Sequence, residues 1–256
     1  MRHFLPILAA LAVGAAWGQD PAYSAANFAN SSDYSPGPFA PNSVLSLFGT
    51  NLSWVTAALA PGDIFAATLP TQLGNVEVIE DGYPVSLLYV SPSQINFIVR
   101  GTEIAGAITV HVVRESSSGP EVTLILVDAA PALFAQSTGY VVATHADGSP
   151  IAADSPAHAG DTVVVYATGL GKTTPNPAPG EIPQTAAQIV SPGSLTVYLD
   201  GAALDPVWIK YAGLTPLSIG LYQINIQLPP NPGTDPEIRV DVGTQESQAG
   251  LKIAVR

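Results

Sequence analysis

The chain has 256 residues, a formal net charge of −12 and 47% hydrophobic residues, which is enough for one large or two ordinary packed domains. Its acidic balance disfavours nucleic acid and anionic membranes as partners. The absence of Cys excludes disulfides and thiolate metal sites. Its 24 Pro and 23 Gly residues favour many short strands joined by turns over long helices.

The first residues have the pattern of a signal peptide. Arg2 precedes an apolar run over residues 4–13, and the small residues Ala16 and Gly18 occupy the −3 and −1 positions of an expected cleavage site before Gln19. The apolar run is too short to span a bilayer, which needs roughly 20 residues, and Pro6 interrupts it. The sequence therefore predicts an exported protein that is extracellular, periplasmic or at the cell surface, with no membrane insertion after cleavage.

Short segments with apolar residues at every second position follow residues 19–42, which are rich in Ser, Asn, Ala and Pro. Such alternation is typical of β-strands with one buried face. In the first half these segments are residues 43–52, 76–79, 91–99, 108–112 and 122–127. Asp81-Gly82 is a strong hairpin signal, because both residues can adopt a positive φ.

The second half repeats these segments in the same order and includes a second hairpin signal, Asp200-Gly201. The repeated segments are residues 161–170, 195–199, 221–228, 238–242 and 251–255, and about ten extra residues are inserted near 211–219. Strand candidates at intervals of about eight to twelve residues are typical of a β-sandwich. Helix is expected only as single turns at residues 56–60 and 185–189.

These patterns predict an all-β protein. We expect two tandem immunoglobulin-like β-sandwiches, at residues 19–134 and 135–256, after a signal peptide at residues 1–18.

Several motifs in order carry a resemblance to a known family. The clearest are Ser46-Leu47-Phe48-Gly49-Thr50-Asn51-Leu52, Ser91-Pro92-Ser93-Gln94-Ile95-Asn96-Phe97, Ala130-Pro131-Ala132-Leu133-Phe134 and Gly220-Leu221-Tyr222-Gln223-Ile224-Asn225. They resemble the Solibacter uncharacterised C-terminal domain, which is found in exported acidobacterial proteins, and each half more loosely resembles the IPT/TIG immunoglobulin-like domains of cell-surface proteins. The family has no established activity, so the resemblance implies no catalytic residues.

Two stretches carry residue types that could bind phosphate or metal. The run Gly169-Leu170-Gly171-Lys172-Thr173 is similar to the end of a phosphate-binding loop, but Tyr166 replaces the first glycine of that pattern and two prolines oppose a following helix. We interpret the run as a turn at the end of a strand.

The second stretch could offer imidazole and carboxylate ligands, with calcium at the domain junction as the most plausible metal. It comprises His145, Asp147, Asp154, His158 and Asp161. Their spacing matches no known metal-binding loop, so a solvated turn and linker are the preferred interpretation. No nucleophile elbow or catalytic triad is recognisable either. The sequence thus predicts no enzyme, no cofactor and no metal.

Three aromatic residues are candidates for ligand contact. Trp54 follows a strand end in a loop, and Tyr89 and Tyr222 accompany rows of amide side chains on the two central strands. Exposed amides beside an aromatic ring could bind carbohydrate. The alternative is that these amides hold neighbouring loops through hydrogen bonds to the backbone.

The leading functional hypothesis is a non-catalytic, exported β-sandwich protein that serves as a binding, adhesion or spacer module for an extracellular protein or glycan. One alternative is a structural subunit that self-associates by donating its N-terminal arm, residues 19–42, to the edge strand of a neighbour. Another is a carbohydrate-binding accessory module.

Overall fold

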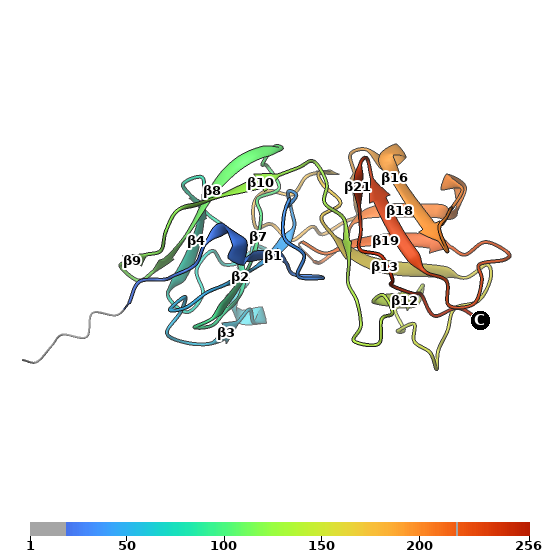
Figure 1. Ribbon diagram of the computed structural model, residues 1–256, viewed down its shortest axis with the longest axis horizontal. Helices are drawn as coiled ribbons and strands as arrows, with labels where there is room; N and C mark the ends of the chain where they lie inside the picture. Colours follow the sequence, from blue (N-terminus) through green and yellow to red (C-terminus); the bar gives the residue numbers. More distant parts are fainter. Residues whose placement is uncertain (1–18, 219) are drawn as a thin grey trace, which may run out of the picture.

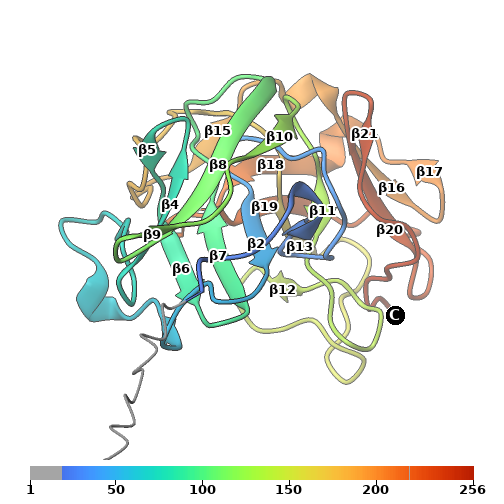
Figure 2. The ribbon, with the colours of Figure 1, turned by 60° about the vertical axis from the view of Figure 1, so that its left-hand side comes forward.

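The computed structural model describes residues 19–218 and 220–256, and the predicted signal peptide lies outside this part of the chain. It contains two β-sandwiches that follow one another along the chain and lie side by side, with the first half on the left in Figure 1 and the second on the right. Figure 2 shows the same arrangement from a view turned toward the first sandwich. The predicted all-β fold with tandem sandwiches is confirmed.

The first sandwich consists of two antiparallel sheets, with strand orders β1-β2-β7-β6-β3 and β10-β8-β4-β5, and β9 pairs with β8. The strands are β1 (Phe28–Asn30), β2 (Val44–Phe48), β3 (Ala57–Ala58), β4 (Val76–Glu80), β5 (Tyr83–Pro84), β6 (Leu87–Val90), β7 (Gln94–Ile98), β8 (Gly106–Arg114), β9 (Ser117–Ser118) and β10 (Val122–Leu126). Alternate residues of these strands fill a core that includes Phe28, Leu45, Phe97 and Val110.

The second sandwich repeats this plan, with orders β11-β13-β19-β18-β15-β14 and β17-β16-β20-β21, and β12 pairs with β13. The strands are β11 (Ala132–Leu133), β12 (Ala143–His145), β13 (Thr162–Thr168), β14 (Thr173–Thr174), β15 (Ala187–Ile189), β16 (Leu195–Leu199), β17 (Ala202–Ala203), β18 (Ile209–Leu214), β19 (Tyr222–Gln227), β20 (Ile238–Val242) and β21 (Gln245–Glu246). Its core includes Val165, Tyr222, Ile224 and Val240.

The internal repeat is visible in two equivalent hairpins, β4–β5 of the first sandwich and β16–β17 of the second. Asp81 and Gly82 have φ values of 46° and 81° between β4 and β5, and Asp200 and Gly201 have 47° and 76° between β16 and β17. Two positive φ values in a row are the geometry that the Asp-Gly dipeptides predict. Both predicted hairpins are confirmed.

Helix is limited to single 3-10 turns within the described residues. They are η1 (Ala25–Asn27), η2 (Pro61–Asp63), η3 (Pro192–Ser194) and η4 (Pro206–Trp208). The helical turns expected at residues 56–60 and 185–189 are wrong, because these segments contain β3 and β15. Ala187 and Ile189 are buried and Gln188 is exposed, which is the two-residue period of a strand. No helix in the described part of the chain is long and apolar enough to cross a membrane.

The join between the sandwiches lies earlier than residue 134. Leu126 belongs to the first core, whereas Ala129 and Leu133 belong to the second. Ala132 and Leu133 form β11, which pairs with β13 of the second sandwich. Residues 127–131, between β10 and β11, therefore form the linker that connects the two units.

The N-terminal arm is an integral part of the first sandwich. Phe28 and Phe39 are 2% and 3% exposed, and β1 pairs with β2. The hydroxyl of Tyr23 accepts a hydrogen bond from the Val112 amide at 2.7 Å, and burial raises the pKa of Tyr23 to about 12. Residues 19–42 are therefore not a free arm, and their donation to a neighbour stays a prediction.

The two sandwiches are joined by hydrogen bonds as well as by the linker. The segment between β14 and β15 reaches across to the first sandwich, where the Leu69 amide donates to the Gly180 carbonyl at 2.9 Å and the Ile182 amide to the Ala67 carbonyl at 2.8 Å. Ile182 also packs against a small separate apolar cluster of the first sandwich. These contacts hold the two units in a defined relative position.

Candidate functional site: the cleft between the sandwiches

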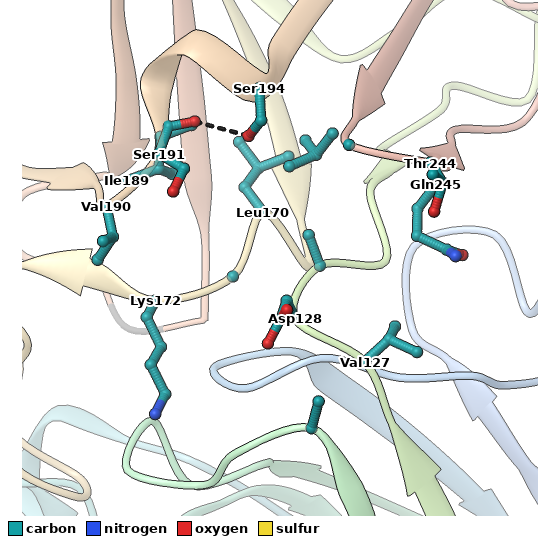
Figure 3. A pocket seen from close by; sticks show the side chains of 15 residues that line it. Val127, Asp128, Leu170, Lys172, Ile189, Val190, Ser191, Ser194, Thr244 and Gln245 are labelled. Atoms are coloured by element: carbon teal, nitrogen blue, oxygen red, sulfur yellow. Dashed lines mark hydrogen bonds between the residues drawn. The ribbon is translucent and has the colours of Figure 1, made fainter.

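A cavity of about 660 Å³ lies at the junction of the two sandwiches (Figure 3). Its walls come from the linker, from the loops that follow β13 and β15, from the β20–β21 turn and from one loop of the first sandwich. The lining residues are Ala105, Val127, Asp128, Ala129, Leu170, Gly171, Lys172, Ile189, Val190, Ser191, Ser194, Val242, Gly243, Thr244 and Gln245.

One side of the cleft depends on two glycines in the loop after β13. Gly169 and Gly171 have φ values of 74° and 88°, which only glycine adopts without strain. The Ala130 amide donates to the Gly169 carbonyl at 2.8 Å, so the linker lies directly against this loop. A Cβ atom on Gly169 would lie 2.0 Å from the Ala130 carbonyl oxygen, and one on Gly171 would lie 2.4 Å from that of Asp128.

These contacts explain the glycines of the Gly-Leu-Gly-Lys-Thr run. They allow the linker to approach the loop, and β14 rather than a helix follows. The interpretation of the run as a turn at the end of a strand is confirmed.

The floor of the cleft is aliphatic and continuous with the core of the second sandwich. Leu170, Ile189 and Val242 are 2%, 4% and 8% exposed and belong to that core. Ala129 of the linker completes this surface. Apolar surface of this kind favours the aliphatic part of a ligand by the hydrophobic effect.

Polar groups line the rim of the cleft. Figure 3 shows Asp128 near the centre of the view, with Lys172 on one side and Gln245 on the other. Ser194 donates its hydroxyl to the Ser191 carbonyl at 2.7 Å. Lys172 forms no ion pair with any residue of the described chain, so its ammonium group can serve an external ligand.

None of the three aromatic residues predicted from the sequence lines the cleft. Tyr222 is 0% exposed, and its hydroxyl donates to the Gly171 carbonyl behind the cleft wall. The prediction that Tyr222 contacts a ligand is therefore wrong, because strand alternation places its ring in the core. Tyr89 is half-buried on β6, and a ligand contact there stays a prediction.

Trp54 is 51% exposed and covers a buried arginine. The guanidinium carbon of Arg114 lies 3.7 Å from the centroid of the Trp54 ring, and Arg114 is 2% exposed. Its terminal nitrogens donate to the carbonyls of Gln19, at 2.9 Å, and Asn51. Trp54 thus has a structural role at the N-terminal arm, and a ligand contact on its exposed side stays a prediction.

Replacing Trp54 with alanine is expected to lower the free energy of unfolding by about 1 kcal/mol, because the cation–π contact between its ring and Arg114 is lost. Chemical denaturation followed by intrinsic fluorescence measures the change. Trp54→Phe is the control, since it keeps an aromatic face over the guanidinium group. If both variants lost the same free energy of unfolding, the stacking of the ring on Arg114 would contribute nothing to stability.

The amides of the two central strands bond to each other. Gln94 donates to the side-chain oxygen of Asn96 at 2.8 Å, and Gln223 donates to that of Asn225 at 3.0 Å. The same pair occurs in β7 and β19, so it belongs to the repeated fold. In the described structure these side chains do not bond to the backbone of neighbouring loops, and a carbohydrate contact at the amides stays a prediction.

The histidine and carboxylate residues between 145 and 161 lie in separate local turns. Asp147 accepts hydrogen bonds from the amide and hydroxyl of Ser149, which lower the pKa of its carboxyl group. His158 lies 3.7 Å from Asp161, and the His145 ring faces the Ser155 carbonyl at 3.3 Å. Within residues 19–218 and 220–256, no three such side chains converge on a common point as a metal site requires.

Sequence reasoning missed the cleft residues Asp128, Lys172 and Gln245. They come from three segments that are distant in sequence, so no local pattern connects them. The sequence contained one indication of this site. Lys172 is one of only three lysines in the chain, and it lies in the glycine-containing run at residues 169–173.

No family model and no curated protein matches the sequence. Among solved structures, the chain is similar to a surface glycan-binding protein from Prevotella bryantii, with 13% identity, 89% of this chain and 41% of that chain covered, and a TM-score of 0.28. A surface glycan-binding protein from the mixed-linkage glucan utilization locus of Bacteroides ovatus gives 8% identity, 93% and 46% coverage, and a TM-score of 0.30. The tandem immunoglobulin repeats of Dlar give 14% identity, 85% and 91% coverage, and a TM-score of 0.21.

The chain spans less than half the length of the two glycan-binding proteins. At these identities and TM-scores the likenesses assign no function.

Proposed function

We propose that this protein is an exported, non-catalytic binding module that holds part of an extracellular partner in the cleft between its sandwiches. The observation that supports this proposal is the cavity of about 660 Å³ at the domain junction. Ligand sites commonly occupy about 300–1,000 Å³, lie at domain interfaces and combine apolar walls with a few polar groups. The floor and the rim of this cleft have that composition.

Binding explains the chemistry of the lining better than catalysis does. The lining contains one amine, one carboxylate, one primary amide and three hydroxyl groups, and no histidine. General acid–base catalysis most often uses histidine, and a hydroxyl nucleophile needs an adjacent base. The lining offers groups that orient a ligand.

The other functions predicted from the sequence have less support. Self-association through the N-terminal arm would require residues that fill the first core, such as Phe28 and Phe39. A carbohydrate platform would rest on Trp54 and Tyr89, which lie outside the cleft lining. The resemblance to the Solibacter domain family stays a prediction and is compatible with the proposed role.

A bulky residue at the cleft should block binding. Val190 lines the cleft and is 58% exposed, so the fold can accept Val190→Trp, which would occupy part of the cavity. The matched control is Val207→Trp, because Val207 is 61% exposed on η4, outside the lining. We expect binding to an array of glycans and peptides to fall at least tenfold for Val190→Trp and to remain for Val207→Trp.

Circular dichroism and thermal unfolding of both variants establish that they are folded. Binding that is equally strong in wild type and Val190→Trp would place the partner site elsewhere. A complete lack of binding on every array would contradict the proposed function.

A further inference from the structure

We propose that the ligand of the cleft is the carboxyl end of a peptide chain with aliphatic residues near its terminus. This inference rests on the proposed binding function and specifies its ligand class. The cleft brings together an amine without an ion-pair partner, a carboxylate, an aliphatic floor and the edge of a sheet. Each of these features matches one part of an extended peptide terminus.

Lys172 is the group that would receive the terminal carboxylate. Its half-buried side chain lines the cleft and has no ion-pair partner among the described residues. An ammonium group donates hydrogen bonds and cannot accept them, so it requires an acceptor, preferably an anionic one. The chain has a formal net charge of −12, so cationic side chains are scarce, and a lysine without an ion-pair partner in a cleft points to a binding role.

Asp128 lines the same cleft and offers hydrogen-bond acceptors, whereas Lys172 offers donors. Asp128 belongs to the linker, and no ion pair joins it to Lys172. An ionised carboxylate only accepts hydrogen bonds, and the donors of a peptide main chain are its N–H groups. One lining residue thus suits the terminal carboxylate, and the other suits a backbone amide of the same peptide.

The floor favours aliphatic side chains over sugar rings. Its apolar members are Ala, Val, Leu and Ile residues, and none of the lining residues is aromatic. Stacking on aromatic rings is the usual way to hold the apolar face of a sugar, whereas aliphatic walls suit residues such as Val, Leu or Ile. The lining therefore supports a peptide in preference to a glycan.

The main chain of such a peptide has an edge to pair with. β21 is the outermost strand of its sheet, and its partner β20 lies on one side only. Thr244, in the turn before this strand, and Gln245, its first residue, line the cleft. An extended peptide can add to an exposed edge through main-chain hydrogen bonds while its side chains enter neighbouring pockets.

The test uses an array of N-acetylated pentapeptides with all combinations of Ala, Val, Leu and Ile at the last two positions. Each peptide is made with a free carboxyl end and as the amide. Peptides that bind are then titrated into the ¹⁵N-labelled exported protein, and amide shifts at the cleft residues report the site. We expect the free carboxylates to bind at least tenfold more tightly than the amides.

Two variants identify the charged partner. Lys172→Met should bind the carboxylate and amide forms equally, because the ammonium group that distinguishes them is gone. The control is Lys210→Met, since Lys210 is exposed, donates to the Val207 carbonyl and lies outside the cleft. Lys210→Met should keep the wild-type preference.

The possible failures are distinguishable. Equal binding of both peptide forms to wild type would overturn the role of the carboxylate. If oligosaccharides but no peptides shift the cleft resonances, the ligand class is wrong and the binding function of the cleft remains. If neither shifts them, both proposals are wrong.

Discussion

Replacing Gly169 with alanine is expected to lower the free energy of unfolding by about 3–5 kcal/mol. The backbone at this position has a φ of 74°, which is unfavourable for any residue with a Cβ atom. The new Cβ would also lie 2.0 Å from the Ala130 carbonyl oxygen, so the linker must move away. The movement would break the bond from the Ala130 amide to the Gly169 carbonyl and deform the cleft.

The matched control is Gly148→Ala. Gly148 has a φ of 85°, and no atom lies within 4 Å of the position of its Cβ. It therefore measures the conformational penalty alone, which we expect to be about 1–2 kcal/mol. Urea denaturation of both variants gives the comparison, and equal losses would show that the contact between linker and loop contributes no stability.

Replacing Glu80 with glutamine is expected to stabilise the protein by about 3 kcal/mol at pH 7, with little effect at pH 4. Glu80 ends β4 and is 0% exposed. Burial raises the pKa of its carboxyl group from 4.5 to about 8, and the Arg100 amide, which donates to it at 3.3 Å, opposes this shift. Its second oxygen has no hydrogen-bond partner in the described structure.

The sign of the effect follows from proton binding. Between pH 4.5 and 8 the folded protein keeps the Glu80 proton, whereas the unfolded chain releases it. Stability therefore falls as the pH rises through this window. At about 1.4 kcal/mol for each pH unit, the loss reaches about 3 kcal/mol at pH 7. Glutamine resembles the protonated acid and does not ionise, so it removes this loss.

The measurement is the free energy of unfolding as a function of pH for wild type and Glu80→Gln. Glu77→Gln is a suitable control, because Glu77 lies on the same strand with its side chain half-buried on the opposite face. Parallel pH profiles for all three proteins would contradict the prediction. The internal repeat supports it independently, since the residue of β16 that corresponds to Glu80 is the buried Leu199.

The sequence by itself determined the all-β architecture and its duplication. The alternation in residues 76–79 and 195–199 and the two Asp-Gly dipeptides are local signals, because the period of a strand and the φ values of a turn depend on adjacent residues. For the same reason the Gly169–Thr173 run was correctly interpreted as a turn. Its prolines and its missing first glycine were visible without coordinates.

Interpretations of the sequence failed at residues whose burial was not recognised. The amide residues beside Tyr222 drew the prediction to the exposed face of the strand, although alternation places Tyr222 on the same face as Ile224 and Ile226, in the second core. Residues 19–42 resembled a flexible arm by composition, yet Phe28 and Phe39 complete the first core. A buried position depends on partners that are distant in sequence, so composition alone does not reveal it.

Only the tertiary structure decided where the candidate site lies. Asp128, Lys172 and Gln245 share a cleft because the linker crosses the Gly169–Gly171 loop and the segment after β14 pairs with the first sandwich. A cleft between two domains depends on their relative position, which is fixed by hydrogen bonds and packing between residues that have no pattern in common along the chain.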